Sequence, residues 1–176
     1  MTCSRHPYSF AFYQKLKDTS LQLRPLIRKE KETDIGAISE ITVAAFQNHP
    51  YSKQTEQFII SSLRAARALT LSLVTIAGRN CDWHGIGPVS VLPDYQRQGI
   101  GKSLVQERLS LLKKSCAKGC VLVGDPGYYV RFGFRNIPGL ILDGVPQEVF
   151  LALPFTADKA DGIVVFHEGF GATSCS

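Results

Sequence analysis

The sequence lacks the features that define several classes of protein. It contains no apolar run of the roughly 18 residues that a membrane-spanning helix needs, no internal repeat and no low-complexity segment. Its 20 Lys and Arg residues against 15 Asp and Glu residues give a net charge of only +5, and they are too dispersed to predict nucleic-acid binding. The 176 residues, 44% of them hydrophobic, therefore favour a globular protein with neither a membrane nor a nucleic acid as partner.

Cysteine is scarce, and its spacing indicates neither a disulfide framework nor a metal site. The five cysteines are Cys3, Cys81, Cys116, Cys120 and Cys175, with no CxxC pair among them and no histidine near enough to Cys116 and Cys120 to complete a metal site. We expect no metal, and for Cys116 and Cys120 we expect roles as small core or helix-end residues. An odd number of cysteines without a pairing pattern favours a reducing, cytoplasmic location.

Acidic residues are absent before Asp18, so the start of the chain differs from the rest. Basic and aromatic residues mix there without a period, and the apolar core of a secretory signal, about 7–15 residues long, is missing. We expect residues 1–22 to be a flexible extension and residues 23–176 to form a single domain.

A regular alternation of strand and helix patterns begins at Leu26. We expect strands near 26–28, 69–77, 86–92, 120–123, 140–142, 149–153 and 162–166, and helices near 35–48, 53–68 and 101–118. The strand, helix and strand between residues 86 and 123 are long enough for a right-handed parallel crossover.

The turn before the helix at 101–118 has the composition of an anion site. Gly99 and Gly101 let the backbone approach a ligand, while Arg97 and Lys102 add positive charge to free N–H groups at a helix start. A phosphate-binding P-loop would require glycine where Gln96 stands, and a dinucleotide fingerprint that starts at Gly99 would require its third glycine where Leu104 stands. A helix-start turn that binds nothing is the remaining alternative.

The surroundings of this turn resemble the acyl-CoA-binding motif of the GNAT superfamily of N-acetyltransferases. That motif reads Arg/Gln-x-x-Gly-x-Gly/Ala, here Gln96, Gly99 and Gly101, after a strand that ends in a Pro-containing turn. About 30 residues later, Tyr129-Val130-Arg131-Phe132-Gly133-Phe134 resembles the Tyr-x-x-x-Gly-Phe element of the same family. The resemblance covers about residues 24–172 and is strongest over 86–134, and the wider context is similar to the YhbS-like branch of predicted acetyltransferases.

The resemblance implies an α/β (α+β) fold. In this fold a mixed, mostly antiparallel sheet is flanked by helices, and one parallel pair of strands splays apart to admit acyl-CoA. Family members usually place a two-strand hairpin between the second helix and the strand that enters the glycine turn. Only residues 69–85 are available here, so we expect the chain to be one strand short. The first strand must then pair parallel through the helical crossover or leave a gap in the sheet.

The resemblance also implies the site residues. Tyr129 aligns with the general acid that protonates the thiolate of CoA, with the adjacent Tyr128 as its rival. The general base is not identifiable, and a relayed water or Glu40 are the alternatives. Asp125 is expected to cap a turn. His84 and His167 are expected to be surface or locally bonded residues, with a structural role for His167. The residues implied to hold acyl-CoA are Val89, Ser90, Val91, Gln96, Arg97, Gln98, Gly99, Ile100, Gly101, Lys102 and Ser103.

Two functions follow from this resemblance. The first is an N-acetyltransferase that moves an acetyl group from acetyl-CoA directly to a primary amine of a small molecule or protein, as a monomer or homodimer. The second is a catalytically weak or inactive protein that binds acyl-CoA or a partner on the same scaffold, because the missing strand alters the acceptor pocket.

Overall fold

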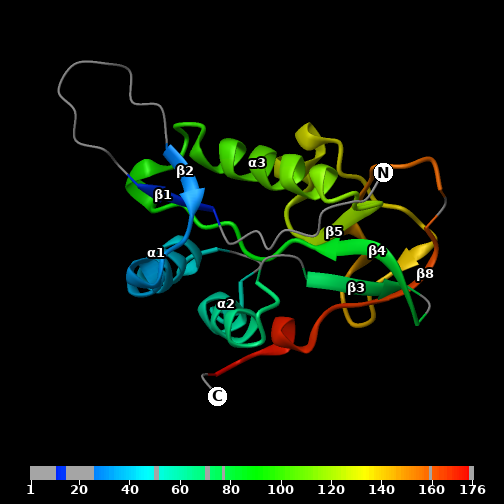
Figure 1. The fold of residues 1–176 in the computed structure, drawn as a ribbon, viewed down its shortest axis with the longest axis horizontal. Helices are drawn as coiled ribbons and strands as arrows, with labels where there is room; N and C mark the ends of the chain where they lie inside the picture. The colour runs from blue at the N-terminus through cyan, green and yellow to red at the C-terminus, as the bar shows by residue number, and fades with distance from the viewer. Residues whose placement is uncertain are drawn as a thin grey trace.

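The computed structural model describes residues 11–14, 26–49, 52–69, 72–76, 78–158 and 160–174. Within these ranges strands and helices are joined by short turns (Figure 1). The strands are β1 (Ala11–Gln14), β2 (Leu26–Lys29), β3 (Ser72–Ile76), β4 (Arg79–Gly85), β5 (Gly119–Val123), β6 (Leu140–Ile141), β7 (Phe150–Pro154) and β8 (Gly162–Val165). The α-helices are α1 (Ile35–Phe46), α2 (Glu56–Ala65), α3 (Ile100–Lys114) and α4 (Pro126–Tyr129), and the short 3-10 helices are η1 (Glu32–Asp34), η2 (Pro93–Tyr95), η3 (Val130–Phe132), η4 (Gln147–Val149) and η5 (Glu168–Gly171).

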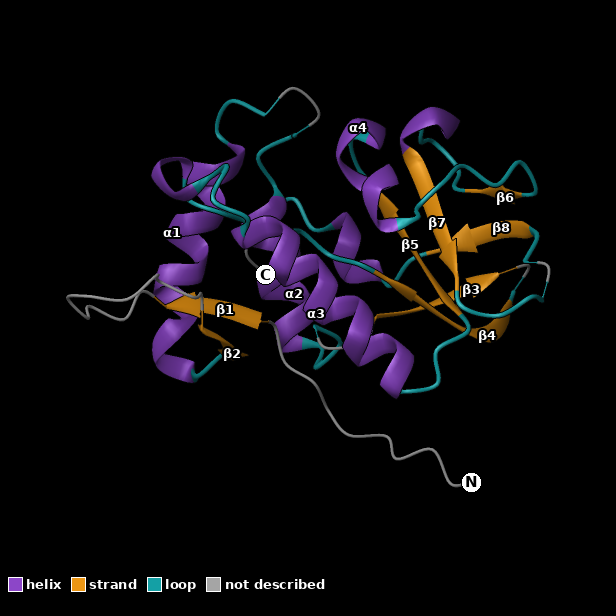
Figure 2. Cartoon of the chain, turned by 90° about the horizontal axis from the view of Figure 1, so that it is seen from above, coloured by secondary structure: helices purple, strands orange, loops and turns teal. Residues whose placement is uncertain are grey.

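Six of these strands form one mixed sheet in the order β6-β8-β3-β4-β5-β7. Neighbouring strands are antiparallel except in the pairs β4–β5 and β6–β8. Seen from above, α1, α2 and α3 lie together beside this sheet (Figure 2). The expected mixed sheet with flanking helices is thus confirmed, and β6–β8 is a second parallel pair that the sequence does not predict.

Two buried clusters lie on opposite faces of the sheet. On the first face, Leu109 and Leu112 of α3 pack against Leu122 of β5. Val121, the neighbour of Leu122, belongs to the second cluster together with Trp83 of β4. Because adjacent strand residues point to opposite faces, this alternation fixes which face of β4 and β5 the helix α3 covers.

The strand that enters the glycine turn lies earlier in the chain than the sequence pattern predicts. We expected it at residues 86–92, but β4 spans Arg79–Gly85 and forms a tight hairpin with β3 through Gly78, whose φ is 72°. Two glycines and the proline at 88, which has no N–H to donate, then interrupt the strand pattern. Residues 86–92 are extended but leave the sheet.

The first predicted strand, β2, lies outside the six-stranded sheet. It pairs antiparallel with β1, and together they form a separate two-stranded sheet. Of the two expected outcomes, a parallel pairing of the first strand or a gap in the sheet, the gap is therefore observed. Strand β3 pairs with the C-terminal strand β8 and not with β2. One strand, β3, stands between α2 and β4, as the short 69–85 segment predicts.

Strand β1 lies within the predicted extension, residues 1–22, and pairs with β2. Residues 11–14 carry two aromatic side chains, which favour strand structure, and the exposed edge of β2 supplies backbone partners for them. The rest of the predicted extension lies outside the described residues.

Two bidentate Arg–carboxylate pairs tie the helices α1 and α2 to the chain around β2. Arg28 donates to both carboxylate oxygens of Asp34, at 2.6 and 3.0 Å, just before α1 begins. Asp34 also accepts from the Lys31 N–H, and these bonds lower the pKa of its carboxyl to about 2. Arg64 of α2 donates to Glu30 at 2.9 and 3.1 Å. The two helices are therefore anchored next to each other, where Ile38 and other apolar residues form a third buried cluster.

The cysteine predictions are partly met. Cys120 is fully buried in the cluster beneath α3, where burial raises the pKa of its thiol. Cys116 follows the end of α3 as expected, but it is exposed and disulfide-bonded, a pairing that the spacing does not predict.

Candidate functional site

The parallel pairing of β4 with β5 stops at Gly85, and an unpaired segment follows. The Ile86 N–H still donates to the Val121 carbonyl at 2.9 Å, but the N–H groups of Val89 and Val91 donate to no described residue. Ile86 and Val89, three residues apart, both pack on the α3 side of the sheet, so the alternation of a regular strand is broken between them. The result is an open backbone edge beside the C-terminal end of β5.

The start of α3 supplies a second set of free backbone donors. The Ser103 N–H donates to the Gly99 carbonyl at 3.0 Å, whereas the five N–H groups from Gln98 to Lys102 have no described partner. No side chain caps this helix end. Because free N–H groups and the helix dipole both favour negative charge, this turn can bind an anion such as a diphosphate. Because the Ser103 N–H is already bonded to Gly99, only the hydroxyl of Ser103 remains available to a ligand.

The turn is held in a left-handed backbone conformation on both sides of Gln98. Gly99 has a φ of 82°, which glycine adopts readily, and Arg97 has a φ of 61°, which costs energy in any residue with a Cβ. A Cβ at position 99 would meet no atom within 4 Å, so glycine is needed there for its φ and not for space. Strain of this kind is often found at binding sites.

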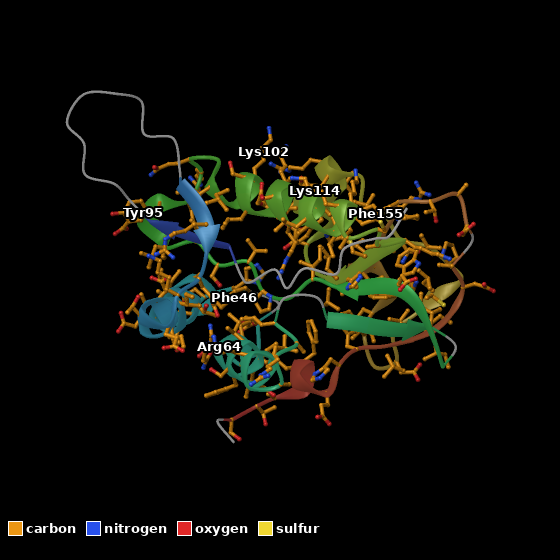
Figure 3. The ribbon with its side chains drawn as sticks, viewed as in Figure 1. Phe46, Arg64, Tyr95, Lys102, Lys114 and Phe155 are labelled. Carbon is orange, nitrogen blue, oxygen red and sulfur yellow. The ribbon has the colours of Figure 1, made fainter. Side chains whose placement is uncertain are left out.

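The glutamine side chains of the turn stabilise it through hydrogen bonds to nearby backbone carbonyls. Gln96 donates to the Val91 carbonyl at 3.1 Å, and Gln98 donates to the Asp94 carbonyl at 3.2 Å. Tyr95 marks this end of α3 in Figure 3, with Lys102 further along the helix. Lys102 is exposed and Ile100 is buried, so of these two only Lys102 offers its side chain to a ligand.

The side chain of Ser90 points toward α1. Its hydroxyl lies 3.1 Å from the hydroxyl of Thr42, which is fully buried and donates to the Ile38 carbonyl at 2.8 Å. This pair fixes the unpaired segment against α1, so its predicted contact with acyl-CoA rests on the backbone of Ser90.

Tyr129 stands at the end of β5, near the open edge. Its ring packs so closely over Gly124 that a Cβ there would lie 2.6 Å from it, and Phe134 contacts it edge-on at 5.8 Å. Burial, with smaller contributions from Tyr128 and Asp125, raises the pKa of Tyr129 to about 12. The phenol is therefore protonated at neutral pH. Its hydroxyl has no described partner, and the residue is partly buried, so the hydroxyl is free to donate to a ligand.

The other face of β4 is filled by the C-terminal segment. A Cβ at Gly85 would lie 2.5 Å from the ring of Phe166, and Phe170 stacks beside Phe166 with ring centroids 4.7 Å apart. The helix η5 that carries Phe170 packs against α2. Gly87 is open by contrast, since a Cβ there would meet only Leu63, at 4.0 Å. Sequence reasoning missed this aromatic contact, and the glycine at 85 was its one local signal.

The residues considered for the role of general base are exposed, buried or bonded elsewhere. Glu40 is exposed on α1, and Asp125 accepts from the Gly127 N–H at 2.9 Å, which confirms its capping role. His167 accepts from the Gly169 N–H through Nδ1, a structural role as expected. His84 contradicts its prediction as a surface or locally bonded residue. It is 6% exposed, and its Nδ1 is buried without a described partner.

Comparison with known proteins identifies the class that this geometry defines. Residues 68–136 match the acetyltransferase (GNAT) domain family. A GNAT family acetyltransferase from Brucella melitensis, solved in complex with acetyl-CoA, is 41% identical, and the match covers 81% of this chain and 96% of that one with a TM-score of 0.70. The chain therefore belongs to the GNAT family of N-acetyltransferases.

Within this family the chain is similar to YhbS of Escherichia coli. The curated E. coli K12 protein, an uncharacterized N-acetyltransferase, is 29% identical in an alignment of 127 residues that covers 62% of this chain and 73% of that protein. The crystal structure of E. coli YhbS in complex with CoA has the same fold, with a TM-score of 0.76 at 23% identity over 90% of this chain and 98% of that one. The resemblance to the YhbS-like branch is thus confirmed.

One further observation concerns membranes. Among the described residues, no helix combines the length and the apolar character needed to cross a bilayer.

Proposed function

We propose that the chain transfers an acetyl group from acetyl-CoA directly to a primary amine of a small molecule or a protein. The observation that carries this proposal is the juxtaposition of the open edge at Val89–Val91 with the five free N–H groups from Gln98 to Lys102. The first would bind the amide groups of the pantetheine arm, and the second would hold the diphosphate. The acetyl-CoA and CoA complexes of the similar proteins support the same donor.

The transfer makes one bond and breaks one. The neutral amine attacks the thioester carbonyl carbon, an N–C bond forms, and the C–S bond breaks to release the CoA thiolate. Before the attack, the protonated amine, whose ordinary pKa is about 10.4, loses one proton to solvent or to a relayed water. After the N–C bond has formed, the nitrogen loses a second proton, and the general acid regains a proton through solvent. The thiolate gains a proton from a general acid, and the products are an amide and CoA.

Tyr129 is the residue that we assign to this acid role. A phenol with a pKa of about 12 loses its proton to a thiolate of pKa about 8.5 at a cost of about 5 kcal/mol in water. Burial of the thiolate beside the apolar residues that surround Tyr129 would raise the pKa of the thiol as well. The difference between the two pKa values, and with it the cost of the proton transfer, would then be smaller. The protonated phenol also stabilises the thiolate as a hydrogen-bond donor before the proton moves.

A noncatalytic acyl-CoA-binding protein is the second candidate. The packing of Phe166 against Gly85 favours it, because that packing fills space on the face of β4 opposite α3. In this reading the turn before α3 still holds CoA, but no amine reaches the thioester.

Thioester consumption separates the two candidates. The purified chain is mixed with acetyl-CoA and a panel of primary amines, and free thiol is measured together with the CoA-dependent change in melting temperature. Amine-dependent thiol release supports the transferase, and a thermal shift without release supports the binder. No shift at millimolar CoA contradicts both. The acceptor, the oligomeric state and the cytoplasmic location remain predictions.

A further inference from the structure

Two adjacent tyrosines, Tyr128 and Tyr129, point to different parts of the site. Their rings meet edge-on, with centroids 5.0 Å apart and planes at 89°. Tyr129 packs over Gly124 at the end of β5, whereas the Tyr128 hydroxyl reaches the first turn of α3. The side chains therefore end in separate places although their backbones are neighbours.

The Tyr128 hydroxyl lies directly over Gly101. A Cβ at position 101 would be 2.7 Å from this oxygen and 3.7 Å from a methyl group of Val91. The hydroxyl and Val91 of the unpaired segment thus both lie beside the first turn of α3. The hydroxyl forms no hydrogen bond with a described residue, and Tyr128 is partly buried.

The ring that carries this hydroxyl is held from two further sides. The guanidinium of Arg131 lies over the ring at 5.0 Å, and Phe132 meets it edge-on at 5.6 Å. Arg131 also donates to the Gly127 carbonyl at 3.4 Å. A donor held in place in this way loses little conformational freedom when a ligand arrives.

We propose that the Tyr128 hydroxyl binds the diphosphate of acyl-CoA, as a side-chain donor added to the backbone N–H groups of residues 98–102. This inference rests on the proposed function, and it assigns the two tyrosines to separate tasks: Tyr128 to binding of the donor substrate and Tyr129 to proton donation. Burial raises the pKa of Tyr128, so its phenol remains a donor at neutral pH. A hydrogen bond to a charged phosphate oxygen is stronger than one between neutral groups.

The matched variants Tyr128→Phe and Tyr129→Phe test this assignment, with CoA and ADP as probes in calorimetric titrations. ADP carries the diphosphate without the pantetheine arm. We expect Tyr128→Phe to weaken the binding of both ligands by about 10-fold. Tyr129→Phe should leave both affinities within about twofold. Weaker CoA binding with unchanged ADP binding would place the contact on the pantetheine arm and overturn the proposal, as would equal affinities for wild type and Tyr128→Phe.

A ligand-free measurement checks the geometry on which the proposal depends. Gly101→Ala places its methyl group 2.7 Å from the Tyr128 hydroxyl, so it should lower the melting temperature. In a Tyr128→Phe background the nearest atoms are 3.7 Å or more away, and the same change should lower it less. Additive effects would contradict the contact. If the wild-type chain binds neither CoA nor ADP, the proposed function fails, whereas a failure confined to Tyr128→Phe affects this inference alone.

Discussion

On the α3 side of β4 the chain presents backbone N–H groups, and on the opposite side it presents aromatic side chains. The first side consists of the turn at Gln98–Lys102 and the open edge at Val89–Val91. On the second side, Phe166 and Phe170 of the C-terminal segment pack against Gly85 and α2. The helix η5 of this segment lies beside α2 (Figure 1). Backbone groups are suited to binding a substrate that many enzymes share, such as acetyl-CoA, because N–H groups stay in place when side chains change. Side chains are suited to binding a substrate that differs from one enzyme to the next, such as the amine.

The largest effect that we predict concerns Tyr129, which packs on the α3 side. Tyr129→Phe removes the proton donor without removing the ring that packs over Gly124. Turnover should fall by about 100-fold or more, and CoA affinity should stay within about twofold. Steady-state kinetics and calorimetry measure the two quantities. A loss of CoA affinity with unchanged kcat would refute the acid role.

The next effect isolates the backbone character of the α3 side. Gly99→Val puts a β-branched residue at a φ of 82°, and we expect CoA affinity to fall by about 30-fold. Gly99→Asn is the matched control, because Asn tolerates this conformation and a Cβ at position 99 meets nothing within 4 Å. It should bind CoA within about threefold of wild type. Equal losses in both variants would mean that the φ of Gly99 is not what the turn requires.

On the opposite side, Gly85→Ala should reduce stability and leave CoA binding unchanged. The new methyl group would lie 2.5 Å from the Phe166 ring, and overpacking of this kind costs about 1–3 kcal/mol, which corresponds to a fall of several degrees in melting temperature. Gly87→Ala should have little effect, since its Cβ meets only Leu63 at 4.0 Å. A change in CoA affinity for Gly85→Ala, with unchanged stability, would show that the two sides are not independent.

The smallest effect concerns His84, which is buried on the α3 side of β4. Burial lowers its pKa below the ordinary 6.5; the nearby Asp82 opposes this shift and Arg108 adds to it. The unfolded chain therefore binds more protons below pH 6.5, so the free energy of unfolding should fall as the pH drops from 7 toward the folded pKa. The slope is at most about 1.4 kcal/mol per pH unit. Urea titrations should show a weaker pH dependence for His84→Leu, and identical slopes would contradict this account.

The sequence predicts the α3 side of the site far better than the other side. The motif at Gln96, Gly99 and Gly101 is local, because its φ values and free N–H groups follow from a few consecutive residues. The α3 stripe and the short strand at Gly119–Val123 are likewise local patterns, and the structure confirms both. The end of β4 at Gly85 was missed because apolar residues continue beyond it, although Pro88 and the two glycines mark the break.

The opposite side could not be predicted because its contacts join distant parts of the chain. Nothing near Phe166 indicates that it packs against a glycine about 80 residues earlier, and the pairing of β8 with β3 depends on a sheet edge that β2 leaves open. The strand β1 is a similar case, since its partner β2 lies across a long connection. Tyr128 combines both kinds of information: the sequence identifies it as the rival of Tyr129, and only the fold brings its hydroxyl over Gly101.

Titration of the ¹⁵N-labelled chain with CoA, followed by amide NMR shifts, tests the central claim most directly. The account predicts that the largest shift changes occur at the N–H groups of Gln98 to Lys102, with a second group at Val89 and Val91. The amides around Gly85 and Phe166 should change little. Saturable binding that leaves the amides of residues 98–102 unchanged, or no binding at millimolar CoA, would contradict the account.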